Sequence, residues 1–382
     1  MSGKESFPPA PKQDKAGSIA AFPRCPMPVD NKIYDSLPDP VILLDEKRHV
    51  VYANRAARDL LDCGAHGGDL AISVRHPAVL DAIDRLREGA GEFITEISFP
   101  VPVERTFELN AMRLTDEGLV ALSNKPELQT VRDVLFFRDV TQAVRADQMR
   151  VDFVANASHE LRSPLAGLLG FIETLKGPAI DDLDARERFL NIMEREAHRM
   201  RRLIDDLLSL LRVEANEHVR PRGNIQIASC VRGALDVLKP RAVSEGMNVV
   251  TDIPAALPPV IGDSDQLTQV LHNLVENAII HGRAGTDITV RAEPIERIPE
   301  SGRPGVAVHI TDQGQGIAKE MIPRLTERFF RVDPARSRSV PTSSTGLGLA
   351  IVKHIIARHR GRLTIDSKLG EGSTFSIYIP SE

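Results

Sequence analysis

The stretch that decides this fold is Phe153-Val-Ala-Asn-Ala-Ser-His-Glu-Leu-Arg-Ser-Pro-Leu165. It lies within a run of apolar residues at alternating spacings of three and four, which is typical of a helix packed in a coiled coil or four-helix bundle. That run comprises Val151, Val154, Leu161, Leu165, Leu168, Ile172 and Leu175, with Ser158 as its polar member. After a break at Gly177-Pro178, a second run comprises Phe189, Met193, Met200, Leu203, Leu207 and Leu210, with Glu196 as its polar member. We expect an antiparallel hairpin, and because one hairpin cannot bury both stripes, a homodimer that forms a four-helix bundle.

The histidine within this stretch is a candidate nucleophile. With the apolar stripe at the a and d positions, His159 and Ser163 lie one helical turn apart on the exposed face. An imidazole in water is largely neutral above its reference pKa of about 6.5, and the neutral ring is nucleophilic. Glu160 stands beside it as a base or orienting group. Because a lone surface histidine is usually a solvated bystander, this interpretation depends on its neighbours.

Downstream, the residues Asp265–Ala278 form an amphipathic helical pattern. Asn273 and Asn277 are four residues apart, so both amides face the same side. Carboxamide oxygens are hard ligands that suit Mg²⁺ when it also keeps waters and phosphate oxygens. Two such residues on a helix are, by themselves, more often ordinary surface groups.

Two glycine-rich turns follow. In Val306–Ile317 a strand pattern runs into Asp312, Gly314 and Gly316; a carboxylate there can accept a hydrogen bond from an adenine amino group, and glycines permit close approach. Gly346 and Gly348 precede a helical pattern, where free N–H groups favour phosphate. The polar segment 333–344 between the turns is expected to be a mobile lid or, equally, a disordered loop.

In combination, these motifs resemble the H, N, G1, F and G2 boxes of the histidine kinases. The resemblance covers roughly 150–380 and implies a phosphoacceptor hairpin followed by an α/β sandwich of the Bergerat type, shared with gyrase and MutL-type ATPases. It implies that His159 carries the phosphoryl group, that Glu160 assists, and that Ser163, where relatives usually have Thr, takes part in dephosphorylating the partner. The residues that it implies in binding ATP are Asn273, Asn277, His281, Asp312, Gly314, Gly316, Phe330, Arg331, Gly346, Gly348 and Leu349. Asn277 is the implied Mg²⁺ ligand.

The sequence departs from this family at two positions. Ile280 replaces a usual Lys and Gln313 replaces an Asn. Loss of the Lys removes a phosphate contact, which weakens ATP binding or shifts the task to Arg331 or Lys353.

The N-terminal third has another organisation. Short strand patterns and helical stretches alternate from about 33 to 140 and predict a small α+β domain. Leu37–Asp45 and Val51–Ala57 resemble the start of a PAS domain, and Phe137–Thr141 resembles its exit into a helix. Arg75–Leu80 is similar to sensor kinases of the phosphate-starvation response. His49, His66 and His76 are ordinary surface histidines in our interpretation, so we expect no haem or flavin.

Composition narrows the function further. A formal net charge of -5 with mixed signs gives no basic surface for nucleic acid. Three separated cysteines fit a reducing cytoplasm, and no run reaches the ~20 apolar residues that a membrane span needs. We expect a cytoplasmic protein, or one held at the inner membrane by partners, and the chain has no Walker A motif. The expected parts are a disordered leader (1–32), a PAS domain (33–141), a dimerisation and phosphotransfer domain (142–217) and an ATP-binding domain (218–382).

The sequence therefore predicts a kinase that autophosphorylates His159 from ATP and Mg²⁺ and passes the phosphoryl group to an Asp of a separate response regulator. Two alternatives remain open at this point. One is a scaffold with a degenerate kinase that acts only by binding partners. The other is a strand-transducing ATPase of the gyrase or MutL kind, although such proteins lack the H box.

Overall fold

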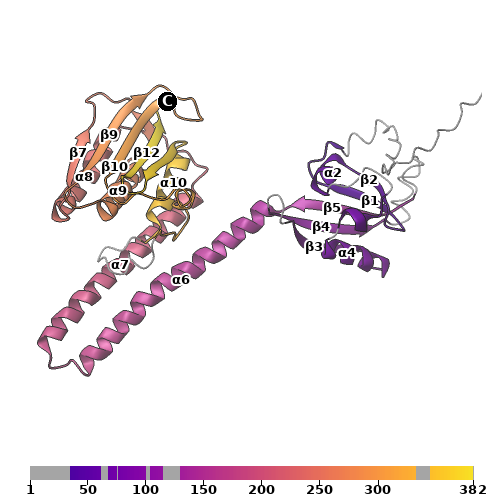
Figure 1. The fold of residues 1–382 in the computed structure, drawn as a ribbon, viewed down its shortest axis with the longest axis horizontal. Coiled ribbons are helices and arrows are strands. Elements are labelled where there is room, and N and C mark those ends of the chain that lie inside the picture. The colour runs from indigo at the N-terminus through magenta and orange to yellow at the C-terminus, as the bar shows by residue number, and fades with distance from the viewer. Residues whose placement is uncertain are drawn as a thin grey trace, which may run out of the picture. The chain divides into compact units, whose positions relative to one another are not determined.

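The computed structural model describes residues 35–61, 68–74, 76–99, 104–114, 130–332 and 345–381. The chain divides into two compact units, Met1–Met149 and Arg150–Glu382 (Figure 1). The expected leader (1–32), the expected lid (333–344), Cys63 and His66 lie outside the described residues. Each unit is therefore described by itself.

The first unit is built on an antiparallel five-stranded sheet with the order β2-β1-β5-β4-β3. Its buried face alternates with a more exposed one along each strand, as expected for a sheet covered on one side. The elements are β1 (Val41–Asp45), β2 (Val50–Ala53), α2 (Arg55–Leu61), α3 (Leu70–Ser73), α4 (Pro77–Arg87), β3 (Glu92–Phe99), β4 (Arg105–Arg113) and β5 (Val131–Asp139). This is the predicted α+β domain.

Two polar residues fix the chain where it leaves this sheet, one after β2 and one at the end of β5. Asn54 is fully buried, and its side-chain oxygen accepts hydrogen bonds from the backbone N–H groups of Val41 and Ala57 at 3.0 and 2.9 Å. At the other end, the Asp139 carboxylate accepts a hydrogen bond from the Thr141 N–H at 3.0 Å. A side-chain acceptor at this point satisfies a free donor of the first helical turn, so the long helix α6 begins here.

The second unit opens with the predicted hairpin. α6 (Thr141–Lys176) starts in the first unit and continues through Pro164 as one helix, and α7 (Leu183–Ala215) follows after a short turn. Asp182 caps α7 by accepting a hydrogen bond from the Ala185 N–H at 2.9 Å. The turn falls at Gly177, where the chain cannot extend the helix into the following proline.

The rest of this unit is an α/β layer pair. A five-stranded sheet has the order β11-β12-β10-β9-β7, and its core is shared with the helices. β7 and β9 are parallel and the other pairs are antiparallel. Its elements are β6 (Gly223–Ile225), α8 (Ile227–Ser244), β7 (Asn248–Asp252), β8 (Val260–Gly262), α9 (Ser264–His281), β9 (Asp287–Ile295), β10 (Gly305–Asp312), η2 (Ile322–Arg324), α10 (Gly348–Arg358), β11 (Arg362–Lys368) and β12 (Gly372–Pro380).

A buried histidine ties two of these helices together. His359 follows α10 and is fully buried, and its Nε2 accepts a hydrogen bond from the Asp263 N–H at 3.0 Å. Burial lowers the pKa of His359, which keeps the ring neutral and able to accept. The Asp263 carboxylate in turn caps α9 by accepting from Asp265 and Gln266. The start of α9 is therefore fixed relative to the end of α10.

The hairpin and the α/β layers belong to one compact unit. Leu203, Leu210 and Val213 of α7 are buried in the same apolar core as the sheet and α8 to α10. The expected seam residues of α7 thus pack partly against the α/β layers, which the helical periodicity could not indicate. This contact places the hairpin beside the nucleotide motifs.

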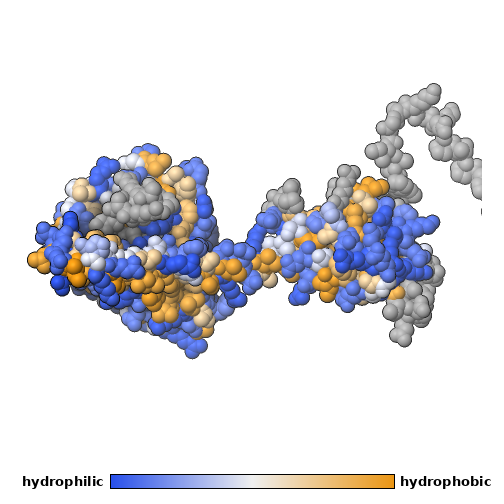
Figure 2. Space-filling model, turned by 90° about the horizontal axis from the view of Figure 1, so that it is seen from below, coloured by the Kyte–Doolittle hydropathy of each residue, from blue (hydrophilic) through white to orange (hydrophobic). Residues whose placement is uncertain are grey.

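An apolar band stays exposed on the hairpin. Each of its members directly follows, in the sequence, a residue of the expected apolar seam. Hydrophobic patches are visible on this unit in the view of Figure 2. The band comprises Leu169, Leu190, Ile204, Leu208 and Leu211, each between 43% and 54% exposed. Leu165, an expected seam residue, is also 47% exposed. Exposed apolar surface of this extent supports the predicted second copy.

Candidate active site

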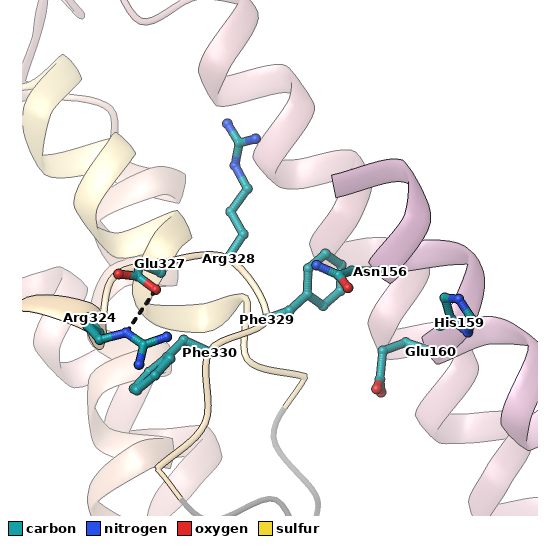
Figure 3. A pocket seen from close by; sticks show the side chains of 8 residues that line it. All are labelled: Asn156, His159, Glu160, Arg324, Glu327, Arg328, Phe329 and Phe330. Atoms are coloured by element: carbon teal, nitrogen blue, oxygen red, sulfur yellow. Dashed lines mark hydrogen bonds and ion pairs between the residues drawn. The ribbon is translucent and has the colours of Figure 1, made fainter. Parts of the chain in front are cut away.

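A pocket of about 290 Å³ lies between α6 and the segment before the second glycine-rich turn. Asn156, His159 and Glu160 line it from α6. The opposite wall is formed by residues on and after η2, and Figure 3 shows the two groups facing each other across the pocket. These residues are Arg324, Glu327, Arg328, Phe329 and Phe330. The structure therefore brings the candidate nucleophile next to the F-box segment, which by the family resemblance comprises residues 326–333.

The α6 wall presents its histidine to solvent. His159 is exposed, as the heptad position predicts, and so is Ser163. Glu160 is half-exposed, and one of its oxygens lies 3.2 Å from an Arg199 guanidinium nitrogen of α7. Because this ion pair crosses from one helix of the hairpin to the other, it fixes the direction of the carboxylate beside His159.

The opposite wall is held by aromatic and charged contacts. The ring of Phe329 packs 5.9 Å from that of Phe153 on α6, and the Arg328 guanidinium lies 5.3 Å from the Phe153 ring centre. Arg328 also makes a 2.7 Å ion pair with Glu214 of α7. Arg324 stacks at 4.4 Å over Phe330. Such cation–π contacts stabilise a segment without secondary structure of its own.

Arg331 is a cationic residue with one buried N–H group that is not hydrogen-bonded among the described residues. Its Nη2 is buried and has no hydrogen-bond partner among the described residues. Burial lowers the pKa of Arg331, and the charge of nearby Glu160 opposes this effect. Desolvation and the charge of Arg331 lower the pKa of His281 at the end of α9, although His281 keeps an exposed surface. A half-buried guanidinium whose Nη2 is buried and without a partner among the described residues fits an anionic ligand such as a phosphate.

The amides of α9 lie on the side of the helix that meets α10. Asn273 donates a hydrogen bond to the Gly348 carbonyl at 3.2 Å, which ties the first turn of α10 to α9. Asn277, one turn later, is half-buried. Within the described part of the chain, no group of three or more His, Cys, Asp and Glu could hold a metal. A Mg²⁺ ion here would need phosphate oxygens and water as its other ligands, which is its usual mode of binding.

Asp312 ends β10 as a buried acid, with 4% of its surface exposed. Burial raises its pKa, and a 2.8 Å hydrogen bond from the Gly314 N–H opposes the rise. A Cβ at Gly314 would collide with the carbonyl of His281, and one at Gly316, where φ is +66°, would collide with the carbonyl of Lys368. Glycine is therefore required at both positions, because any side chain there would collide with the neighbouring backbone.

The second glycine-rich turn leads directly into α10. Gly346 has a φ of +73° and packs against the backbone of Phe329, whose N–H donates to the Gly346 carbonyl at 2.9 Å. Gly348 begins α10, so its turn presents the N-terminal N–H groups of that helix. Leu349 is partly buried against the core. Ile280 is half-buried and Lys353 is exposed on α10.

Several lining residues were not identified from the sequence. Asn156 precedes His159 by three residues and shares its side of α6, a signal that the helical spacing contains. Arg324 precedes the F box and Arg328 lies within it, but a charged surface residue alone does not indicate that it faces the hairpin. Arg199 reaches Glu160 through the pairing of α7 with α6 inside the hairpin, whereas Asp206 of α7 reaches Thr345 through the docking of the hairpin on the α/β layers.

Comparison with known proteins agrees with this geometry. The family of histidine kinase-, DNA gyrase B- and HSP90-like ATPases matches residues 262–382, the His Kinase A (phospho-acceptor) domain matches 149–216, and a PAS domain matches 31–97. The match to a phospho-acceptor domain favours a kinase over the strand-transducing ATPases. None of the helices in the described ranges is long and apolar enough to cross a membrane.

Two curated relatives cover most of the chain. Sensor-like histidine kinase SenX3 of Mycolicibacterium smegmatis is 34% identical over 346 residues, which are 89% of this chain and 82% of that protein. Phosphate regulon sensor protein PhoR of Pseudomonas aeruginosa is 35% identical over 351 residues, 90% of this chain and 72% of that protein. Among solved structures, histidine kinase AdeS of Acinetobacter baumannii is 27% identical with a TM-score of 0.45, over 59% of this chain and 98% of that one. The chain therefore belongs to the sensor histidine kinases of two-component systems, which are ATP-dependent protein-histidine kinases.

Proposed function

We propose that His159 is the residue that this kinase phosphorylates. The observation that carries the proposal is the pocket in which the exposed imidazole and the F-box residues Phe329 and Phe330 share one cavity. Phe329 lines this pocket and its N–H donates to the Gly346 carbonyl, so phosphates held at that turn would lie near the pocket. Proximity of this kind removes much of the entropic barrier to phosphoryl transfer.

In the proposed step, an imidazole nitrogen of His159 attacks the γ-phosphorus of ATP, and the bond from that phosphorus to the bridging oxygen of ADP breaks. Glu160 accepts the proton that the ring loses, while Arg199 holds the carboxylate in place. The free Nη2 of Arg331 lies in the same cluster of charges as Glu160 and neutralises the charge that develops on the phosphoryl oxygens.

The nucleotide itself is assigned to the α/β layers. The Asp312 carboxylate accepts a hydrogen bond from the adenine amino group, and Gly314 and Gly316 leave room for the ring. The turn Gly346–Gly348 and Asn273, which donates to the Gly348 carbonyl, would contact the phosphates, and we assign Phe330, His281 and Leu349 to the same nucleotide. Mg²⁺ would be held by Asn277 with phosphate oxygens, and it supplies charge neutralisation during transfer.

The phosphoryl group then passes to an Asp carboxylate of a response regulator receiver domain, which regenerates His159. Ser163, one turn along the exposed face, keeps the hydroxyl that dephosphorylation of that partner would require. We extend the similarity with the phosphate regulon sensor to the stimulus, and assign the kinase to phosphate-starvation signalling. The exposed leucines of the hairpin support a homodimer as the working form.

The first prediction tests this assignment with γ-labelled ATP and the full chain. Wild-type protein should acquire a label that is lost in acid and stable in alkali, because a phosphorus–nitrogen bond has that stability. His159→Gln should abolish the label, whereas His198→Gln, which changes an exposed histidine of α7, should label normally. Undiminished labelling of His159→Gln would refute the site. Steady ATP hydrolysis without any label would favour the ATPase alternative, and absence of Mg-ATP binding would favour the scaffold.

A further inference from the structure

A hydrogen bond joins the phosphoacceptor hairpin to the second glycine-rich turn. The Thr345 hydroxyl donates to the Asp206 carboxylate of α7 at 2.7 Å. Thr345 immediately precedes Gly346, and the bond connects residues 139 positions apart in the sequence. It is therefore a tertiary contact between the part that accepts the phosphoryl group and the turn that is assigned to the phosphates.

The turn is otherwise built entirely from the α/β layers. The Leu347 N–H donates to the Thr345 hydroxyl at 3.3 Å, the Gly346 carbonyl accepts from Phe329, and the Gly348 carbonyl accepts from Asn273. Asp206 adds a partner from α7 to this group. Because Thr345 uses its hydroxyl both as donor to α7 and as acceptor within the turn, a shift of α7 is transmitted to the backbone at Leu347.

Asp206 stands in an environment that is costly for a carboxylate. Burial raises its pKa, and the hydrogen bond from Thr345 is the largest effect that opposes the rise. The negative charge of Glu276 on α9 also raises the pKa. Desolvation of a carboxylate near another acid destabilises its charged form, and the hydrogen bond from Thr345 and the charge of Arg202 both oppose this effect.

We propose that Asp206 is a positioning residue for autophosphorylation, which sets the Gly346–Gly348 turn, and with it the phosphates, in register with His159. The proposal rests on the proposed function of His159. Asp206 contacts neither the reacting atoms nor the nucleotide, because all groups assigned to ATP lie outside α7. It acts only when the hairpin and the α/β layers are packed together.

The test measures initial autophosphorylation rates of the full chain against ATP concentration. Asp206→Ala should lower the rate at saturating ATP by roughly tenfold, the effect of losing a hydrogen bond to a charged group. The ATP concentration at half-saturation should stay within about twofold, since the ATP-binding groups are unchanged. Asp206→Asn should restore most of the rate, because its amide oxygen can accept the same bond. Asp205→Ala, at the adjacent exposed acid, is the matched control and should behave as wild type.

Thr345→Val removes the same hydrogen bond from its donor side. In the double variant, its effect on the maximal rate should not add to that of Asp206→Ala. An unchanged maximal rate in Asp206→Ala, an Asp206→Asn variant as slow as Asp206→Ala, or a raised half-saturation with an unchanged maximal rate would overturn the proposal. Equal melting temperatures of the variants exclude misfolding as the cause. If wild-type protein carries no label on His159, the proposed function has failed; if it does and Asp206→Ala matches it, only this inference has failed.

Discussion

Burial gives the Asp312 carboxyl group a higher pKa than it would have in water. Because the charged form loses solvation at the end of β10, the pKa is raised, and the Gly314 N–H compensates only partly. The group is therefore protonated at a higher pH than an exposed aspartate. An adenine amino group can donate to the carboxylate, but the protonated acid loses that acceptor on one oxygen.

Because the pKa of Asp312 is raised, the second prediction concerns how ATP affinity depends on pH. Affinity should be full above the raised pKa of Asp312 and should weaken as the pH falls through it. ATP phosphates also titrate, so the comparison is with Asp312→Asn, which cannot titrate at this position. Calorimetry over a pH series should show the ratio of wild-type to variant affinity falling as the pH falls. A ratio that does not change with pH would contradict the adenine role of Asp312.

The third prediction separates backbone strain from steric collision at glycine. Gly316 and Gly302 share a φ of +66°, but a Cβ at Gly302 meets open space, whereas one at Gly316 meets the carbonyl of Lys368. Gly302→Ala should cost about 1 kcal/mol of unfolding free energy from the left-handed conformation alone. Gly316→Ala should cost more and should also weaken ATP binding. Thermal denaturation with titration of ATP measures both, and equal effects of the two substitutions would disprove the close packing.

At the scale of elements, periodicity predicted much of the secondary structure. Helical spacing located α6 and α7 and the break at Gly177, and alternation located the strands of the first unit. β5 extends further than its apolar run, from Val131 to Asp139, because pairing with both β1 and β4 stabilises the added residues. Local apolar pattern does not contain that long-range pairing.

The candidate site also has a part that the sequence predicted and a part that depends on contacts between distant residues. His159, Asp312 and the glycines belong to compact motifs, so the sequence identified them before the structure positioned them. The contacts of α7 with the α/β layers, such as Arg328 with Glu214, join residues 114 positions apart and have no local signature. The packing of Leu203 and Leu210 against the α/β core likewise depends on docking, which a heptad pattern cannot predict.

The fourth prediction concerns the hairpin as a dimerisation element. Leu165 of α6 is 47% exposed in the single chain, and a four-helix bundle would cover it. Leu165→Asp should therefore shift the protein from dimer to monomer in sedimentation velocity, because a buried charge opposes the interface. Leu369→Asp is the control, since Leu369 is 65% exposed between β11 and β12, outside the hairpin. A dimer that withstands Leu165→Asp would place the interface elsewhere.

At the scale of the whole molecule, α6 is the element that the two units share. It begins after β5 of the first unit, at the Asp139–Thr141 contact, and carries His159 in the second unit. α6 therefore runs without a break from the first unit to the proposed phosphoacceptor. The contacts of α7 with the F-box segment and with Thr345 hold the nucleotide side in reach of the same histidine.

The most direct test of the account is to locate the phosphoryl group in the 382-residue chain. After reaction with Mg-ATP, the chain would be digested at alkaline pH and its phosphopeptides sequenced by mass spectrometry. The account predicts that, among the 11 histidines, the phosphoryl group is found on His159. A phosphoryl group on another histidine, or on a residue such as Ser163, with His159 unmodified, would contradict it.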